Sequence, residues 1–231
     1  MTGKLYLIGT KGSKRKDFFE KAAAECRVPV EFIDWAEAEH ASLSGGTVKI
    51  DPPAYSTSDL WQMNGQVSAY RSRLRVLENR GCAFLNTPSG IESVLDKFSC
   101  KKKLMEHGIA VTEMISEQVL RAEEPERADG AVERLEDMMR RCRASSVFIK
   151  PAYSSGAAGV VAYRKFPGSG REAAYTSCRV LGGELVNTKN IYRLDEREEI
   201  AALLRSVLYL GVIVERWHPK ASYQGKSFDL R

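Results

Sequence analysis

The sequence lacks the residue patterns that mark common metal and redox proteins. It contains 5 cysteines, none of them in a Cys-x-x-Cys pair, and 3 scattered histidines. The usual zinc frameworks and the thioredoxin motif are therefore excluded. Because the cysteines are odd in number and widely spaced, we expect reduced thiols rather than disulfides, as in a cytoplasmic protein.

Long apolar runs are also missing. The apolar run at the N-terminus extends only from Leu5 to Ile8, whereas a signal peptide needs about 7–15 apolar residues. No run approaches the roughly 18 residues of a membrane-spanning helix. We therefore expect a cytoplasmic protein that has no membrane partner.

Charge of one sign is not concentrated anywhere in the chain. Lys and Arg number 35 and Asp and Glu 30, which gives a net charge of +5. The basic clusters at 14–16, 101–103 and 140–143 lie in helix-like stretches mixed with acids, so we interpret them as solvated helix faces. Nucleic-acid binding requires a denser basic stripe with stacking aromatics, and no nucleic-acid partner is expected. An anionic small molecule is compatible with this charge.

The first part of the chain has the pattern of a parallel α/β domain. Residues 4–8 and 28–35 are predicted strands, and the segment between them, 16–26, has helical spacing. A longer helix is predicted over 60–79, followed by a short strand at 82–85. The Gly-, Pro- and Ser-rich stretch 42–57 is expected to be a loop.

The second part mixes helices and strands in a different order. Thr87-Pro88 resembles a helix start, and Gly108 is at the position that closes a helix. Gly182-Gly183 is most simply a turn. The remaining expected elements are helices at 96–107, 132–142 and 194–208, strands at 109–114, 147–150, 160–164 and 211–217, and a charged break at 123–129.

The most informative segment is the strand–loop–strand at 147–164. Lys150 ends the first strand and is followed by the small-residue loop 151–159, PAYSSGAAG. Small residues allow backbone N–H groups to surround a phosphate, and a lysine at the strand end adds positive charge. A plain hairpin with a surface lysine explains the same residues equally well. The loop is neither a Walker A motif nor a G-x-G-x-x-G loop that opens a helix.

Four short motifs occur in an order that resembles the ATP-grasp superfamily. They are Asn86-Thr87-Pro88 with Asp96-Lys97 and Gly108-Ile109, then Lys150-Pro151, then VIVERW at 212–217, then Asp229-Leu230-Arg231. The order is most similar to the branch that contains a ribosomal-protein glutamate ligase and glutathione synthetase-like enzymes. The resemblance implies mixed α/β and α+β architecture: a Rossmann-like pre-ATP-grasp domain at 1–86 and a partial ATP-grasp domain at 87–231. The latter would have a lid at about 112–213 and a hinge at about 213–219.

The resemblance also implies which residues contact the phosphates of ATP. Lys97 matches a lysine that reaches the phosphates from the first subdomain. Lys150 matches the lysine of the lid strand, near the α-phosphate and the adenine. Ser154, Ser155 and Gly156 match the mobile loop over the β- and γ-phosphates. Lysine charges and a closing loop suit phosphoryl transfer, which depends mainly on charge neutralisation and positioning.

The remaining site residues come from the hinge and the last motif. Glu215, Arg216 and Trp217 match the hinge, where backbone groups and the acid contact the adenine edge. Asp229 matches a ribose or substrate contact. Arg231 matches an arginine near the transferred phosphoryl group, the expected catalytic residue.

The implied activity is ATP-dependent ligation of a carboxylate to an amine through an acylphosphate. The partners would be ATP and small-molecule or peptide substrates, and the oligomeric state is not predicted. The family's magnesium ligands, an acid and then Glu-x-Asn, are expected beyond Arg231, so we interpret the chain as a C-terminally incomplete ligase.

Other interpretations of the same residues stay open. The chain could be a non-catalytic nucleotide-binding or scaffold relative without the metal site, or a generic α/β domain that binds a sugar or nucleotide. Lys97 could be an exposed helix lysine, and Glu215 an acid on an edge strand. Trp217 could be a core residue, which is compatible with a place in the hinge, and His218 is expected to be structural or at the surface.

Overall fold

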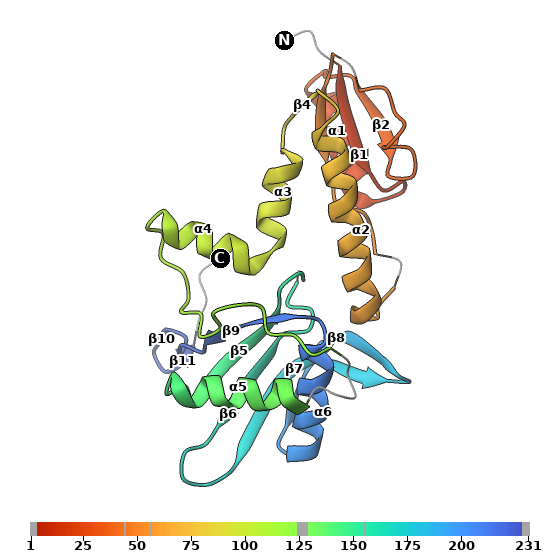
Figure 1. The fold of residues 1–231 in the computed structure, drawn as a ribbon. Helices are drawn as coiled ribbons and strands as arrows, with labels where there is room; N and C mark the ends of the chain where they lie inside the picture. The colour runs from red at the N-terminus through yellow and green to blue at the C-terminus, as the bar shows by residue number, and fades with distance from the viewer. Residues whose placement is uncertain (1–3, 44, 56, 124–128, 155, 228–231) are drawn as a thin grey trace. The chain divides into compact units, whose positions relative to one another are not determined.

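The chain divides into two compact units, Met1–Cys100 and Lys101–Arg231. The computed structural model describes residues 4–43, 45–55, 57–123, 129–154 and 156–227. The division falls inside helix α4 (Lys97–Glu106) (Figure 1). The functional domain boundary expected after residue 86 stays a prediction.

The first unit is a parallel α/β structure. Its four strands pair in the order β2-β1-β3-β4, and each neighbouring pair is parallel. The strands are β1 (Leu5–Gly9), β2 (Val30–Asp34), β3 (Thr47–Ile50) and β4 (Ala83–Phe84). The helices are α1 (Lys14–Glu25), α2 (Leu60–Glu78) and α3 (Pro88–Leu95). This is the β-α-β architecture predicted from the sequence.

Helix α2 supplies much of the core of this unit. Its buried residues Val67, Tyr70, Leu74 and Leu77 follow steps of three and four, which places them on one side of the helix. The Tyr70 ring meets Trp35, which follows β2, edge-on at a centroid distance of 5.3 Å. The sheet and α2 therefore share one apolar core.

The loop predicted over 42–57 is wrong at β3. Thr47–Ile50 pairs with β1 in parallel, and Val48 is fully buried. The flanking Gly, Pro and Ser residues mask a short strand whose burial comes from neighbours distant in sequence. By contrast, the helix start at Thr87-Pro88 is confirmed, because the Thr87 hydroxyl caps α3 by accepting from the Gly90 N–H at 3.1 Å.

The second unit is built on a five-stranded antiparallel sheet in the order β8-β7-β6-β5-β9. Its strands are β5 (Ser146–Pro151), β6 (Val161–Lys165), β7 (Glu172–Leu181), β8 (Glu184–Leu194) and β9 (Val212–Arg216). Helices α5 (Asp129–Arg141) and α6 (Arg197–Leu208) pack on one face of this sheet (Figure 1). A separate two-stranded ribbon is formed by β10 (Ser222–Tyr223) and β11 (Lys226–Ser227).

Alternation along the strands separates an apolar face from a mixed one, which carries Lys150 and Glu215 beside Phe148 and the fully buried Ile213 and which we call the polar face. Val147 and Ile149 of β5 are fully buried, as are Val212 and Val214 of β9. The residues between them point to the other face, because successive side chains of a strand alternate. The polar face of the second unit is therefore opposite α5 and α6.

One prediction for this unit is wrong, one helix begins three residues later than expected, and one prediction is confirmed. Residues 109–113 form no strand, and Met114 makes only an isolated bridge to Glu215. The helix expected over 194–208 begins at Arg197, because β8 continues to Leu194. The turn at Gly182-Gly183 is confirmed: both residues have positive φ and join β7 to β8.

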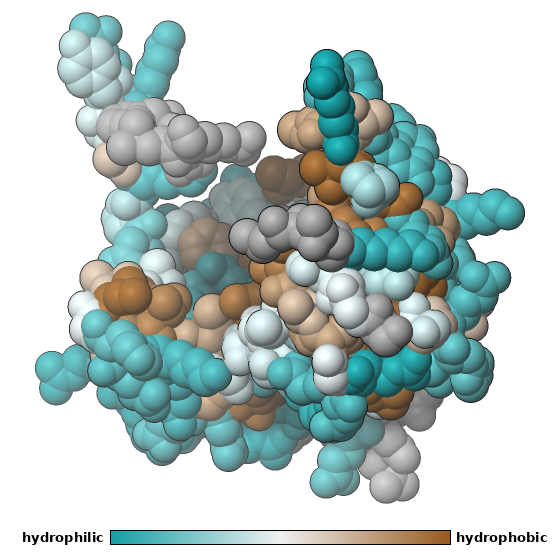
Figure 2. All heavy atoms as spheres, turned by 90° about the horizontal axis from the view of Figure 1, so that it is seen from above, coloured by the Kyte–Doolittle hydropathy of each residue, from teal (hydrophilic) through white to brown (hydrophobic). Residues whose placement is uncertain are grey.

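Hydrophilic side chains cover much of the face shown in Figure 2, with smaller apolar groups between them. Scattered apolar side chains of this kind are ordinary on a protein surface. Among the described residues, no helix combines the length and the apolar character needed to cross a membrane.

Candidate functional site

The polar face of the second unit brings Lys150 and Glu215 together. β5 and β9 are antiparallel neighbours, with Phe148 opposite Glu215 and Lys150 opposite Ile213. Lys150 and Glu215 are thus diagonal neighbours on one face, within reach of each other. The Lys150 Nζ lies 2.7 Å from the Glu215 Oε2. Both residues were predicted from the sequence as site residues.

Two further groups contact the Glu215 carboxylate. The Nζ of Lys101, in α4, lies 2.7 Å from the Oε1. The hydroxyl of Thr112 donates to the Oε2 at 2.8 Å. Lys101 also donates to the Thr112 hydroxyl and, at 3.2 Å, to its carbonyl oxygen. Glu215, with a side chain only 2% exposed, therefore has three polar partners.

These partners keep the buried acid ionised. Burial raises the pKa of Glu215, but the hydrogen bonds from Lys101, Lys150 and Thr112 outweigh burial and hold the pKa below its usual 4.5. At neutral pH Glu215 is a carboxylate with two ammonium groups beside it. Two cations and one anion give the cluster a net positive charge.

Aromatic rings lie on the same face as this cluster. The Trp217 ring packs against Phe148 at a centroid distance of 5.3 Å and against Tyr175 at 6.2 Å. The Arg164 guanidinium lies 4.8 Å from the Trp217 ring centre, and the Lys150 Nζ lies 5.4 Å from that of Phe148. Trp217 thus packs against other aromatic rings and also lies on the face that carries the cluster. Cations, an acceptor and flat rings together could bind a phosphorylated heteroaromatic molecule.

The side chain of Arg216 is held elsewhere. Its Nε lies 2.6 Å and its Nη2 3.0 Å from the two carboxylate oxygens of Glu113. The Nη2 also donates to the Cys142 carbonyl at 2.9 Å. The Arg216 side chain thus lies on the opposite face of the sheet from Glu215. Only the backbone of Arg216 could make the contact predicted for the hinge.

The loop after Lys150 has an unusual backbone. Gly156, Ala157 and Gly159 all have positive φ, between 61° and 71°. A Cβ on Gly156 would meet no atom within 4 Å, so the glycine is required by conformation rather than by space. Ser154 donates to the Pro151 carbonyl at 3.5 Å. Such a turn can present backbone N–H groups to an anion.

The structure does not place four of the predicted residues relative to this cluster. Lys97 is the first residue of α4 and belongs to the first unit. Ser155, Asp229 and Arg231 lie outside the described residues. His218, expected to be structural or at the surface, is exposed.

Lys101 and Thr112 are site residues that sequence reasoning missed. Lys101 was assigned with its neighbours to a solvated helix face, which is wrong for this residue: its side chain is 16% exposed. No local pattern separates it from Lys102 and Lys103, which are exposed. Only the contact with the distant Glu215 distinguishes it.

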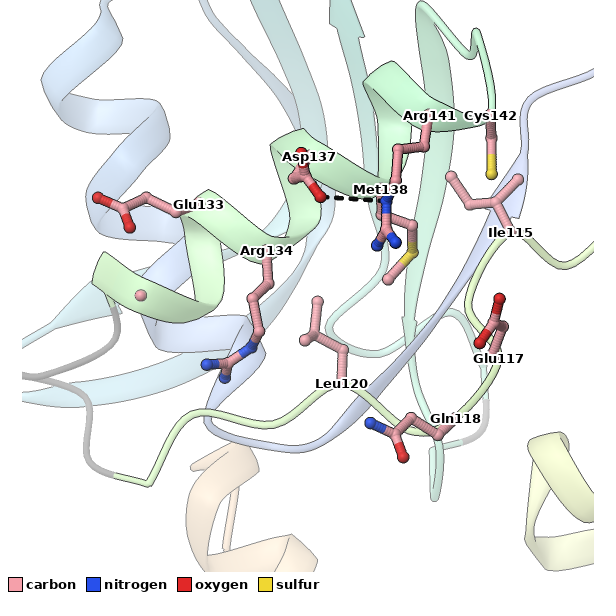
Figure 3. Close-up of a pocket in the computed structure, with 11 residues that line it drawn as sticks. Ile115, Glu117, Gln118, Leu120, Glu133, Arg134, Asp137, Met138, Arg141 and Cys142 are labelled. Carbon is pink, nitrogen blue, oxygen red and sulfur yellow. Dashed lines mark ion pairs between the residues drawn. The ribbon is translucent and has the colours of Figure 1, made fainter.

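A cavity of about 760 Å³ lies beside α5, on the sheet side that α5 covers (Figure 3). Its lining combines residues of α5 with those of the segment 115–120, and it includes Arg141, paired with Asp137 at 3.0 Å. None of the residues predicted from the sequence lines this cavity. The lining contains both acidic and basic side chains, so no single ligand charge is favoured.

The described residues do not fit a magnesium ion. No group of three or more His, Cys, Asp or Glu side chains gathers as metal ligands in the described part of the chain. Glu215, the buried acid of the cluster, is already occupied by ammonium and hydroxyl donors. Magnesium ligands beyond residue 231 stay a prediction.

Comparisons with known proteins bear on the fold. No protein-family model and no curated protein matches the sequence. Among solved structures, N5-carboxyaminoimidazole ribonucleotide synthetase from Thermotoga maritima is similar with a TM-score of 0.50 and 13% identity. The match covers 94% of this chain and 46% of that chain.

Two other solved structures are similar at lower scores. The RimK domain protein ATP-grasp from Sphaerobacter thermophilus has a TM-score of 0.46 and 10% identity, over 95% of this chain and 66% of that one. D-cycloserine synthetase DcsG has a TM-score of 0.46 and 15% identity, over 90% and 80%. The chain thus spans less than two thirds of the synthetase from Thermotoga and of the RimK domain protein. Likeness at these identities concerns the fold alone, which this chain shares in outline with the synthetase from Thermotoga.

Proposed function

We propose that the chain binds ATP on the polar face of the second unit and serves as a carboxylate–amine ligase. The observation that carries the proposal is the Lys150–Glu215 pair, at 2.7 Å, beside the aromatic group of Phe148, Tyr175 and Trp217. A triphosphate needs cations, and an adenosine needs flat contacts and hydrogen-bond acceptors. This face combines all three.

Each group of the face has a specific task in this proposal. The Lys150 ammonium pairs with a phosphate oxygen, and the Glu215 carboxylate accepts a hydrogen bond from the adenine amino group or a ribose hydroxyl. The loop 151–159 closes over the outer phosphates with its backbone N–H groups. Lys97 of the first unit, and Ser155, Asp229 and Arg231, are proposed to complete the site as the resemblance implies.

The proposed reaction has two steps. A carboxylate oxygen attacks the γ-phosphorus of ATP, the bond to the bridging oxygen breaks, and ADP leaves, which yields an acylphosphate. An amine nitrogen then attacks the acyl carbon and phosphate leaves; the amine gives up a proton as the amide forms. The chain's contribution is to position the partners and balance charge. Magnesium, when bound to ATP, supplies further charge neutralisation.

The acid and the amine are proposed only as classes. DcsG is a D-cycloserine synthetase by name, and another similar structure, PsnB, was solved with a precursor peptide. Small-molecule and peptide substrates are therefore both within the proposal.

The test is ATP binding measured by calorimetry on the full chain. Wild-type protein is expected to bind ATP, and Lys150→Met to bind it at least roughly tenfold more weakly, because a phosphate partner is lost. Lys165→Met is the matched control: Lys165 forms an ion pair of 2.6 Å with Glu136 of α5, outside the proposed site. Equal affinity in all three proteins, or no binding by the wild type, contradicts the proposal.

Turnover separates the ligase from its non-catalytic alternative. The full chain is incubated with ATP, magnesium and mixtures of carboxylates and amines, and ADP and phosphate are measured. Release of both that depends on acid and amine supports the ligase. ATP binding without release supports a nucleotide-binding relative.

A further inference from the structure

The buried carboxylate of Glu215 forms ion pairs with two cations, although one would neutralise its charge. Lys150 alone would neutralise it, at 2.7 Å from the Oε2, but Lys101 lies equally close to the Oε1. The Lys101 side chain is 16% exposed and that of Lys150 is 29% exposed. Burying an additional ammonium group carries a desolvation cost, so its presence calls for an explanation.

The two lysines differ in how firmly they are held. Lys101 also donates to the hydroxyl and the carbonyl oxygen of Thr112, whose hydroxyl in turn donates to Glu215. Lys101, Thr112 and Glu215 thus form a closed ring of two hydrogen bonds and one ion pair. The Lys150 ammonium donates to Glu215, and Lys150 lies near the end of β5, directly before the small-residue loop.

This difference matters when Lys150 turns toward a phosphate. Without Lys101, Lys150 would leave behind an unpaired buried carboxylate, and that carboxylate would repel the phosphate. With Lys101 in place, Glu215 keeps a counter-ion and the cluster remains net positive.

We infer that Lys101 is a positioning residue of the nucleotide site, which holds Glu215 charged and in place so that Lys150 is free to bind phosphate. The inference rests on the proposed function, because it concerns the same site. It predicts that the effect of removing Lys101 depends on the charge of Glu215 and on the phosphates of the ligand. A purely structural role would show neither dependence.

A double-mutant cycle tests the inference on the full chain. ATP and adenosine affinities are measured for wild type, Lys101→Gln, Glu215→Gln and the double variant. Lys101→Gln is expected to weaken ATP binding by roughly tenfold or more but adenosine binding far less. In the Glu215→Gln background the same substitution is expected to cost only about twofold, because no carboxylate remains to hold Lys150.

Further variants keep the result interpretable. Lys101→Arg retains the charge and should bind ATP within about threefold of wild type, while Lys165→Met controls for the loss of an ion-paired lysine. Melting temperatures report whether each variant folds. If Lys101→Gln does not fold, the ratio of ATP affinity to adenosine affinity is compared between Lys101→Arg and Thr112→Val. The Thr112→Val variant keeps the lysine charge but breaks the ring.

The outcomes separate this inference from the proposed function. If wild-type protein binds no ATP, both fail. If Lys150→Met loses ATP binding while Lys101→Gln retains it, or if Lys101→Gln costs the same with and without the Glu215 charge, only the role of Lys101 is overturned.

Discussion

Glu215 combines deep burial with a charge, and this combination makes stability depend on pH. Its pKa in the folded chain is below 4.5, which is its ordinary value. A carboxylate with a lowered folded pKa contributes stability above the unfolded pKa and loses it as the pH falls through the folded pKa. The contribution is therefore present at neutral pH and disappears in acid below about pH 4.5.

We predict that Glu215→Gln lowers the free energy of unfolding at pH 7 by about 1–3 kcal/mol, because two ammonium groups lose their partner. The deficit should shrink as the pH falls below about 4.5, since the carboxyl of the unfolded wild-type chain is protonated first and that of the folded chain follows at its lower pKa. Urea unfolding from pH 3 to 7 measures it. A deficit that is constant over this range contradicts the assignment, and Glu184→Gln, which changes an exposed acid at the start of β8, is the control.

Two buried tyrosines provide a matched test of hydrogen bonding. Tyr163 donates to the carboxylate of Glu172, whereas the Tyr70 hydroxyl has no partner among the described residues. Burial is the main cause that raises the pKa of both. We predict that Tyr163→Phe lowers the unfolding free energy by about 1–3 kcal/mol, because the Glu172 carboxylate loses a donor, while Tyr70→Phe changes it little. Urea unfolding measures the change in unfolding free energy for both variants, and equal decreases would contradict the hydrogen-bond explanation.

Single residues differ in how far the sequence reveals them. Lys150 and Glu215 could be proposed because each lies near the end of a strand and matches a motif, and their contact supports grouping them. Lys101 could not, since only its approach to a carboxylate more than a hundred positions away separates it from its exposed neighbours. Residue type and spacing say nothing of such long-range contacts.

At the scale of elements, two helix ends use the same backbone conformation with different residues. Gly108 follows α4 with φ of 71°, and Ile109 donates to the Leu104 carbonyl at 2.9 Å. Arg143 follows α5 with φ of 48°, and Ala144 donates to the Met139 carbonyl at 2.8 Å. Both ends have the hydrogen bond of a Schellman motif, which favours glycine.

We predict opposite effects of substitution at these two ends. Gly108→Ala should lower the unfolding free energy by about 1 kcal/mol, and Arg143→Gly should raise it by about 0.5–1 kcal/mol, because a side chain is unfavourable at positive φ. Thermal unfolding of the two variants measures both. A stabilised Gly108→Ala or a destabilised Arg143→Gly would contradict this interpretation of the helix ends.

Elements with strong local signals were predicted well, and those that depend on partners were not. Helix α2 was recognisable from its apolar steps of three and four, and Gly108 as a helix end. β3 was missed because its four residues lie among turn-forming residues and become a strand only beside β1. Residues 109–114 have strand-like apolar residues, but their pairing with β9 is limited to the isolated bridge between Met114 and Glu215, where the Arg216 N–H donates to the Glu113 carbonyl at 2.9 Å.

At the scale of the whole molecule, the two units differ in what their sheets leave for function. The first unit has a parallel sheet, a type that is normally covered on both faces. The second has an antiparallel sheet with α5 and α6 on one face, which leaves charged and aromatic side chains to the other. The topology, which the resemblance predicted in outline, therefore assigns the polar cluster to one identifiable face.

Hydrogen exchange of the full chain, with and without ATP, tests most directly where ATP binds. ATP is expected to slow amide exchange in β5, the loop 151–159 and β9, because it would cover the cluster and order the loop. Exchange in α5, which lines the cavity on the other side of the sheet, is expected to change little. Protection confined to α5 and the segment 115–120, or no protection at saturating ATP, would contradict an ATP site on the polar face.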